Sequence, residues 1–240
     1  MKKIFFVIFL FYSSINFAQE VQNIFFFNPN YDLNIPLADL KADYGLSSSI
    51  GLDFSIISKK NLFYSISNSL MFGSNIKDTT ILDHLMDENR NIIDQNGQIS
   101  DIIIQQRGFN SNLKLGYLFA KEEKSSGLLC YLHAGFHQNK KRIDVRNGTV
   151  PQLDENYIKI YDQLRNGLSI GGFLGFLHIS EKNNTHFITG IEFSKSYSKN
   201  RRDYNFAQVK EGFYNDSFIN LKFGWIIPIS KRKVREFYYF

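Results

Sequence analysis

Residues 219–227 read INLKFGWII, and this stretch decides the fold class. Large apolar side chains fall at every second position: Ile219, Leu221, Phe223, Trp225 and Ile227. Polar or small residues fall between them: Asn220, Lys222 and Gly224. Because successive side chains of a β-strand point to opposite faces, this alternation predicts a strand with one apolar and one polar face.

The same period of two recurs around residues 51–56, 112–119 and 187–193. The predicted strands exceed the ~5–6 residues usual in soluble proteins and match the ~9–11 residues that a tilted strand needs to cross a membrane. The alternation predicts a lipid-facing set: Leu52, Phe54, Leu113, Leu115, Ile191, Phe193, Ile219, Leu221, Phe223 and Trp225.

The connections between the predicted strands alternate between short and long. Residues 58–61, 120–126 and 181–184 form short polar turns, whereas 75–101, 146–165 and 199–214 are long. Outer-membrane barrels place short turns in the periplasm and long loops outside the cell. The sequence therefore predicts an antiparallel transmembrane β-barrel with that orientation.

Seven strands can be assigned directly: 46–58, 62–74, 104–119, 127–143, 166–180, 185–198 and 215–229. Bacterial single-chain barrels use even strand numbers, so an eighth strand is expected before the first long loop. Val21–Pro29 (VQNIFFFNP) is the candidate, although its Phe run does not alternate. This prediction places Pro36 and the segment 38–44 in the first outside loop. The expected fold is an all-β, eight-stranded barrel.

Composition agrees with one barrel domain and excludes several other classes. The 240 residues include 24 Phe and 13 Tyr, yet mean hydropathy is only −0.24. After the N-terminus, no apolar run approaches the ~18 residues of a membrane helix. Cys130 stands alone, which excludes a disulfide framework and a thiolate metal cluster. The net charge of +5 is too weak to indicate nucleic acid, and no cofactor is expected.

The segment 1–18 (MKKIFFVIFLFYSSINFA) has the features of a signal peptide. Lys2 and Lys3 precede a short apolar core, and small residues end with Ala18. Cleavage after Ala18 would leave residues 19–230 as the barrel and 231–240 (KRKVREFYYF) as a basic and aromatic periplasmic tail. The tail is either a displaced assembly signal or a docking segment, and an uncleaved anchor helix is the alternative for the N-terminus.

The polar faces of the predicted strands contain an inward set of charged and histidine side chains: Asp53, Lys114, His133, His137, Glu192 and Lys222. An eight-stranded barrel is narrow enough for side chains to fill. Two carboxylates and two amines can neutralise each other there, as buried charges require. We interpret the set as a structural polar plug and not a pore, in preference to an acid/base pair of Glu192 with His133.

The long loops contain more apolar residues than solvated loops need. The loop 75–101 places four of them at helical spacing: Ile81, Leu82, Leu85 and Met86. The loop 146–165 holds six more: Val150, Leu153, Tyr157, Ile160, Tyr161 and Leu164. Capping of the barrel or contact with an envelope protein partner would explain them. Arg201 and Arg202 could contact lipopolysaccharide phosphates, although anchoring of their own loop is the simpler reading.

Several motifs spread along the chain support a resemblance to small outer-membrane β-barrels of the Bacteroidetes. They are LADLKADYG at 37–45, FGS at 72–74, RGF at 107–109, VPQL at 150–153, YDQLRNG at 161–167, RRDYNF at 201–206 and GWIIP at 224–228. Some barrels of that phylum that resemble this chain serve type IX secretion as accessory subunits. The resemblance implies the barrel and the outer membrane, and it carries no catalytic residues.

The sequence therefore predicts a non-enzymatic outer-membrane β-barrel. Its predicted role is as an accessory or interaction subunit of an envelope complex such as type IX secretion. Outer-membrane lipid, lipopolysaccharide and envelope proteins are the expected partners, contacted through the loops 75–101 and 146–165 or the tail 231–240. The alternative is a lipid A-modifying enzyme, for which His178 next to Ser180 is the one Ser–His pairing at a strand end. A porin is the third reading, and the narrow lumen argues against it.

Overall fold

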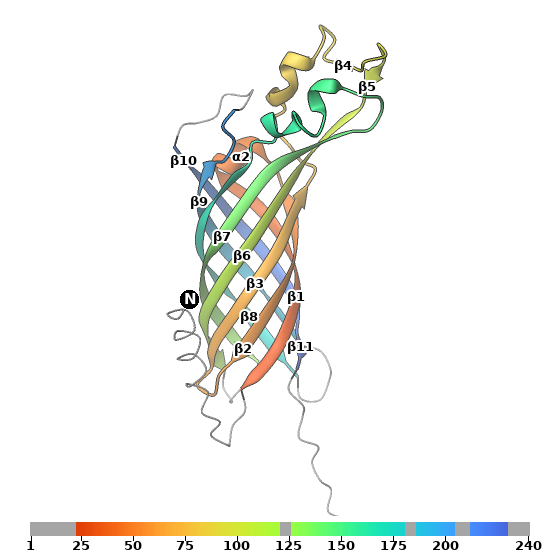
Figure 1. The fold of residues 1–240 in the computed structure, drawn as a ribbon. Helices are drawn as coiled ribbons and strands as arrows, with labels where there is room; N and C mark the ends of the chain where they lie inside the picture. Colours follow the sequence, from red (N-terminus) through yellow and green to blue (C-terminus); the bar gives the residue numbers. More distant parts are fainter. Residues whose placement is uncertain (1–22, 121–125, 181–185, 205–211, 230–240) are drawn as a thin grey trace, which may run out of the picture.

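The computed structural model describes residues 23–120, 126–180, 186–204 and 212–229. Eight long antiparallel strands form a closed ring (Figure 1). The strands are β1 (Ile24–Ala38), β2 (Ser47–Ile57), β3 (Leu62–Gly73), β6 (Ile102–Ala120), β7 (Gly127–Val145), β8 (Arg165–Ile179), β9 (His186–Asn200) and β10 (Phe213–Trp225). The predicted fold is confirmed. The predicted signal peptide 1–18 and tail 231–240 lie outside the described residues.

Pairing of β1 with β10 closes the ring, in a register that runs from Asn30↔Gly224 to Ala38↔Asp216. The short strand β11 (Ile227–Pro228) continues this pairing. Because β1 extends to Ala38, the prediction that Pro36 lies in a loop was wrong. The pairing of β1 with β2 ends at Asn34. Pro36 lies beyond this point, so its missing N–H interrupts no hydrogen bond between β1 and β2.

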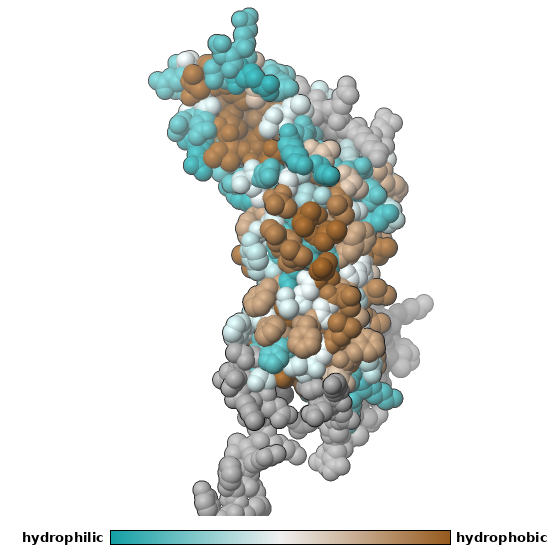
Figure 2. Space-filling model, turned by 180° about the vertical axis from the view of Figure 1, so that it is seen from behind, coloured by the Kyte–Doolittle hydropathy of each residue, from teal (hydrophilic) through white to brown (hydrophobic). Residues whose placement is uncertain are grey.

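The barrel wall is apolar outside and polar inside. Figure 2 shows brown, hydrophobic side chains over much of one face of the wall. Leu113 is 64% exposed and its neighbour Lys114 only 4%. Because water-soluble domains bury their apolar residues, this inversion identifies lipid as the solvent of the outer wall. No helix among the described residues is long and apolar enough to span a membrane.

The first outside loop forms a lid on the barrel mouth. Its short helix α2 (Asp39–Asp43) and the following Tyr44 bury Leu40 and Tyr44 completely. These two side chains pack with Met71, Phe218 and Ile76. Arg165 holds the lid down, because its guanidinium lies 2.5 Å from the Asp43 carboxylate. The lid therefore closes the long-loop end of the lumen.

The strands β6 and β7 rise beyond the ring as a two-stranded stalk (Figure 1). The strand β3 reaches β6 only as far as the Gly73↔Gln106 pair, and β8 reaches β7 only as far as Asn139↔Arg165. Above these points, residues 102–105 of β6 pair with β7 alone. The stalk carries the head, which we define as residues 74–105 and 140–164.

The head has a hydrophobic core of its own. It contains the 3-10 helices η1 (Thr80–Leu85), η2 (Pro151–Leu153) and η3 (Ile158–Ile160) and the hairpin β4 (Ile92–Ile93) and β5 (Ile99–Ser100). Seven buried side chains form the core: Ile81, Leu82, Ile92, Ile143, Val150, Leu153 and Tyr161. Both long loops and the stalk contribute to it, so the head is one folded unit.

Candidate functional site

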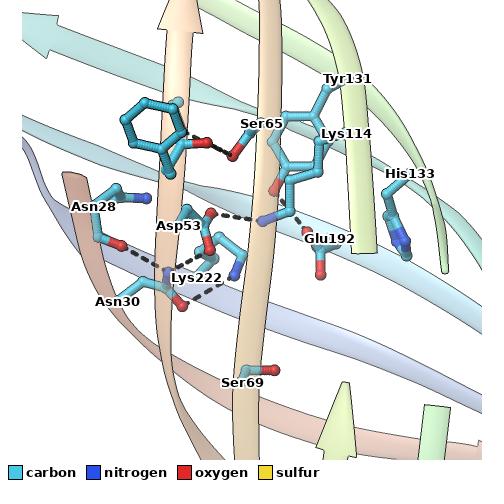
Figure 3. Close-up of polar contacts among 12 residues, drawn as sticks. Asn28, Asn30, Asp53, Ser65, Ser69, Lys114, Tyr131, His133, Glu192 and Lys222 are labelled. Carbon is cyan, nitrogen blue, oxygen red and sulfur yellow. Dashed lines mark hydrogen bonds and ion pairs between the residues drawn. The ribbon is translucent and has the colours of Figure 1, made fainter. Parts of the chain in front are cut away.

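The lumen contains the polar network that the alternation predicts. The strands β2, β6, β9 and β10 direct Asp53, Lys114, Glu192 and Lys222 inward, and all four residues are at most 6% exposed (Figure 3). Each occupies a polar position between outward apolar neighbours, such as Leu113 and Leu115 on either side of Lys114. The wall of the barrel therefore brings together charges that are far apart in the sequence.

The charge pairing within this network differs from the predicted one. Lys114 Nζ lies 2.7 Å from Asp53 Oδ2, as expected for opposite charges. Lys222 instead pairs with Asp32, at 2.8 Å, and Asp32 lies in β1 beyond the end of the predicted strand 21–29. Three carboxylates therefore line the central part of the described lumen together with two lysines. Charges buried in this way need partners with good geometry.

Glu192 is held by neutral groups. The Tyr131 hydroxyl donates to Glu192 Oε2 at 2.6 Å, and the Asn220 amide donates to Oε1 at 3.4 Å (Figure 3). The imidazole of His133 hydrogen-bonds Ser194 at 3.2 Å. Because each group has another partner, the geometry gives no direct acid/base contact between Glu192 and His133.

His137 also lies inside the barrel, where its environment is structural. Its Nδ1 is 2.6 Å from Asn110 Oδ1, and its ring meets Phe218 edge to face at 5.5 Å. Among the described residues, no group of three or more His, Cys, Asp or Glu is placed to hold a metal ion. The two histidines thus act as hydrogen-bonding members of the lumen wall.

Apolar side chains close the lumen at its short-turn end. Ten buried residues make this plug: Phe26, Ile57, Phe63, Leu118, Leu129, Tyr131, Phe173, Leu177, Ile188 and Ile226. The ring of Phe173 occupies the space over the paired glycines Gly175 and Gly190, where a Cβ at either position would meet it within 2.6 Å. A glycine pair is therefore required for this aromatic to fold across the lumen.

Between the plug and the lid, the lumen has a free volume of about 20 Å³. A single water needs ~10–15 Å³ of such volume, so the space holds roughly one water and no solute. Within the described part of the barrel, the charged network, the apolar plug and the lid fill the lumen along its axis. This geometry argues against the porin reading.

The residues predicted to face lipid form the outer surface of the wall. Nine are exposed: Leu52, Phe54, Leu113, Leu115, Ile191, Phe193, Leu221, Phe223 and Trp225. Ile219 points the same way but is half-buried. On β6 the apolar positions run from Phe119 to Phe109, which is roughly 26 Å of height for a strand tilted by about 40°. That height matches the ~25 Å apolar band of outer-membrane barrels.

The structure places His178, the histidine of the predicted Ser–His pair, next to a different serine. His178 Nδ1 lies 2.8 Å from the hydroxyl of Ser126, whereas the sequence pointed to Ser180. The Ser126 hydroxyl also accepts a hydrogen bond from the backbone N–H of Ile179 at 3.0 Å. This hydroxyl ties β7 to β8 at the short-turn end, which is a structural role.

The outside arginines are held by the head and by β8. Arg202 makes a bidentate contact with Asp162, at 2.8 Å and 2.5 Å. Arg201 Nε donates to Asn166 at 2.6 Å. Arg202 is therefore engaged by an internal carboxylate. The simpler expectation, that it anchors the loop, is the one that the contacts support.

The head presents a groove of about 330 Å³ beside its core, lined by both apolar and polar side chains. Its apolar lining consists of Ile76, Leu82, Met86, Ile92, Ile99, Ile102 and Ile104, with Arg90 at the rim. Ile99 is 65% exposed. Figure 2 shows a brown area in the head surrounded by teal. Five of the ten apolar loop residues singled out from the sequence are buried in the core, four are half-buried, and Tyr157 is exposed. The groove combines two of these residues, Leu82 and Met86, with residues that the sequence analysis did not single out, such as Ile99.

Sequence reasoning missed Asp32 in the lumen and the two lid residues Leu40 and Tyr44. Asp32 could have been found, because Asn28, Asn30, Asp32 and Asn34 alternate with larger residues. The lid residues carry no local signal, since their burial depends on contacts with β3 and β10. A sequence pattern identifies the face of a strand but does not identify a loop that folds back.

Comparisons with known proteins add little to this geometry. No family model matches the chain, and no curated protein matches it. Among solved structures, it is similar to Ail, the attachment invasion locus protein of Yersinia pestis, at 10% identity, over 86% of this chain and all of that one. The TM-score is 0.43 for Ail in complex with the heparin analogue sucrose octasulfate and 0.41 for Ail alone. Because the sequence identity and the TM-scores are this low, the assignment of the barrel fold rests on the strand pairing of this chain.

Strand closure, the inverted polarity of the wall and the sorted connections lead to one conclusion. The ring is complete between β1 and β10, so no sheet edge faces the lipid. The wall carries an apolar band of membrane height, and the long connections lie together at one end (Figure 1). The chain is an integral outer-membrane β-barrel.

Proposed function

We propose that this barrel is a non-enzymatic membrane anchor that displays the head to a protein partner at the cell surface. The observation that carries the proposal is the groove of the head, which exposes apolar side chains such as Ile99 among polar ones. A unit that buries its own core has no folding need for exposed side chains such as Ile99 along a groove. Exposed apolar grooves with polar rims are typical of interaction sites.

The groove lies beside an unpaired strand edge. The N–H of Arg146 donates to the carbonyl of Asp101 at 2.8 Å, so this pair is hydrogen-bonded. In an antiparallel ladder the bonded positions alternate. Ile102 and Ile104 therefore direct their backbone groups away from β7, and no strand among the described residues pairs with them on that side.

An extended segment of a partner fits both features. It could pair with the β6 edge through its backbone and place alternate apolar side chains in the groove. The lipid-embedded barrel would hold the head at a fixed height above the membrane, because the stalk continues two of the barrel strands. This arrangement supports an accessory or interaction subunit better than a transport or catalytic role.

Site-specific photo-crosslinking in native membranes tests the proposal. A crosslinking residue at Ile99 should capture one discrete protein, whereas the same residue at Tyr157, which is exposed elsewhere on the head, should not. An Ile99→Lys variant should lose the partner during purification, and Tyr157→Lys should keep it. Recovery of the wild type from native membranes as a lone monomer, with no capture at Ile99, would contradict it.

Membership of a type IX secretion complex is a narrower version of this proposal, and its support is the resemblance of the sequence motifs. Under this version, the protein captured at Ile99 is a component of that machinery, and deletion of the barrel reduces secretion of its substrates. Capture of an unrelated envelope protein would leave the display function and remove the type IX assignment.

The alternative of a lipid A-modifying enzyme is favoured by one contact, the pair of Ser126 and His178. That pair lies at the short-turn end, whereas lipid A occupies the outer leaflet on the long-loop side. Mass spectrometry of lipid A from a deletion strain would show an altered structure if this alternative were correct. The display function predicts unchanged lipid A.

A further inference from the structure

A basic pair lies on the outer wall directly above the apolar band. Arg107 on β6 faces Lys140 on β7 as a cross-strand neighbour. Arg107 is six residues from outward Leu113, and Lys140 is eight residues from outward Leu132. Because side chains on one face recur every second residue, both basic side chains point outward.

Neither cation of this pair has a carboxylate partner among the described residues. The Arg107 guanidinium donates to the carbonyl of Gln106 at 3.0 Å and to Gln105 Oε1 at 2.6 Å, and both acceptors are neutral. The nearby Arg142, by contrast, is 3.5 Å from Asp144. Two uncompensated positive charges therefore stand side by side at the membrane surface.

The basic pair forms the upper rim of a depression in the wall. The depression has a volume of about 430 Å³, and apolar side chains form its lower part: Leu70, Phe72 and Phe109. Leu70 is 62% exposed. The apolar part is continuous with the lipid-facing band, while Arg107, Lys140 and Gln138 supply donors above it.

We infer that this depression binds lipid A of the outer leaflet. One acyl chain lies along Leu70, Phe72 and Phe109, and a sugar phosphate lies between Arg107 and Lys140. Charge complementarity identifies the head group, because a phosphate accepts charge-assisted hydrogen bonds from both cations. The position identifies the leaflet, since the basic pair lies on the long-loop side of the band. This inference goes beyond the display function, which it does not require.

Other lysines at a similar level provide a comparison. Lys199 on β9 lies over the ring of Phe213, with 4.3 Å between Nζ and the ring centroid. Lys195 lies 5.1 Å from the ring of Tyr197 in the same way. These lysines have aromatic partners and do not line the depression. Lys199→Gln is therefore a matched control that removes one exposed positive charge outside the site.

Native mass spectrometry of the full-length barrel in detergent tests the inference. The probes are bis-phosphorylated lipid A, the same lipid after removal of its phosphates, and phosphatidylglycerol. The wild type should retain lipid A, and the double variant Arg107→Gln/Lys140→Gln should bind it at least about tenfold more weakly, as expected for the loss of two charged contacts. Lys199→Gln should bind like the wild type.

The other two lipid probes distinguish a lipid A phosphate from the phosphate of another anionic lipid. Weak binding of dephosphorylated lipid A and of phosphatidylglycerol would support a lipid A site. Equal binding of phosphatidylglycerol would overturn it, because the site would then recognise any anionic lipid. An unchanged affinity in the double variant, or an equal loss in Lys199→Gln, would also overturn it. An unaltered heat-dependent shift in electrophoretic mobility would show that the double variant is folded.

Discussion

The barrel and the head place polar and apolar side chains in opposite ways. The barrel buries Asp53, Lys114 and Glu192 inside and exposes Leu113 outside, whereas the head buries Leu82 inside and exposes charged residues. The barrel satisfies its backbone by closing a ring of strands in lipid. The head folds because water drives its apolar side chains together. The polar network of the barrel and the apolar core of the head are therefore each specified by the solvent around that part of the chain.

The largest expected effect is the loss of a lumen charge. Lys114→Met leaves Asp53 without its cation, and breaking a buried ion pair costs about 3–5 kcal/mol. The free energy of unfolding, measured by urea titration in lipid vesicles, should fall by that amount. The double variant Asp53→Leu/Lys114→Met should recover most of the loss. Equal stability of Lys114→Met and the wild type would show that the lumen is hydrated enough to solvate the charge.

The head core should respond to apolar truncation without involving the barrel. Leu82 is 1% exposed, and Leu82→Ala should destabilise the head by about 2–5 kcal/mol through the cavity it leaves. Hydrogen exchange should increase in residues 74–105 and 140–164 and stay unchanged in the lower halves of the strands. A matching increase throughout the barrel would contradict the separation of the head core from the barrel.

Sequence alternation predicted most of the barrel because both of its faces are tightly constrained. Seven strands alternate clearly, since lipid requires apolar residues outside and the filled lumen requires polar residues inside. The first strand was placed incompletely because Phe25, Phe26 and Phe27 are all apolar. Phe26 belongs to the plug while its neighbours face outward, so the alternation disappears at that end.

The head and the lid could not be predicted in the same way. Their cores combine residues from distant parts of the chain, such as Leu82 with Tyr161 and Leu40 with Phe218. The apolar spacing in both long loops was visible, but it did not distinguish a core from a partner surface. The basic pair was missed because Arg107 and Lys140 become neighbours only through the register of β6 and β7.

An introduced charge should destabilise the lipid-facing wall much more than it destabilises the surface of the head. Leu113→Arg places a cation in the apolar band, which should cost about 2–4 kcal/mol near the middle of the membrane. Tyr157→Arg on the surface of the head should change stability by less than about 0.5 kcal/mol. Vesicle unfolding curves for the two variants provide the comparison. A small effect at Leu113 would mean that this face does not contact hydrocarbon.

A smaller loss of stability is expected from the ion pair that joins the stalk to the segment just before η1. Lys141 Nζ lies 2.6 Å from Asp78 Oδ2. Partial burial works to raise the pKa of Asp78, but hydrogen bonds from Lys141 and Thr80 outweigh it and hold this pKa below the usual value. A lowered folded pKa means that the stabilisation is present at neutral pH and is lost as the pH falls through that pKa.

Asp78→Asn should therefore destabilise the head by about 1.5 kcal/mol at pH 7, at the low end for a charged hydrogen bond because Asp78 is partly exposed. The difference from the wild type should vanish in acid, once Asp78 is protonated. Limited proteolysis of the head at several pH values measures it. A difference that stays constant with pH would show that the charge of Asp78 contributes nothing.

Spin-label accessibility along β6 tests the central claim most directly. Single labels at residues 109–119, in a Cys130→Ser background reconstituted in bilayers, would report collisions with oxygen, which is concentrated in hydrocarbon. A lipid-facing β6 should give maxima at the odd positions such as Leu113 and Leu115, minima at even positions such as Lys114, and accessibility to a water-soluble reagent above Arg107. Uniform accessibility along the strand, or maxima at the even positions, would contradict a barrel with apolar residues outside and polar residues inside.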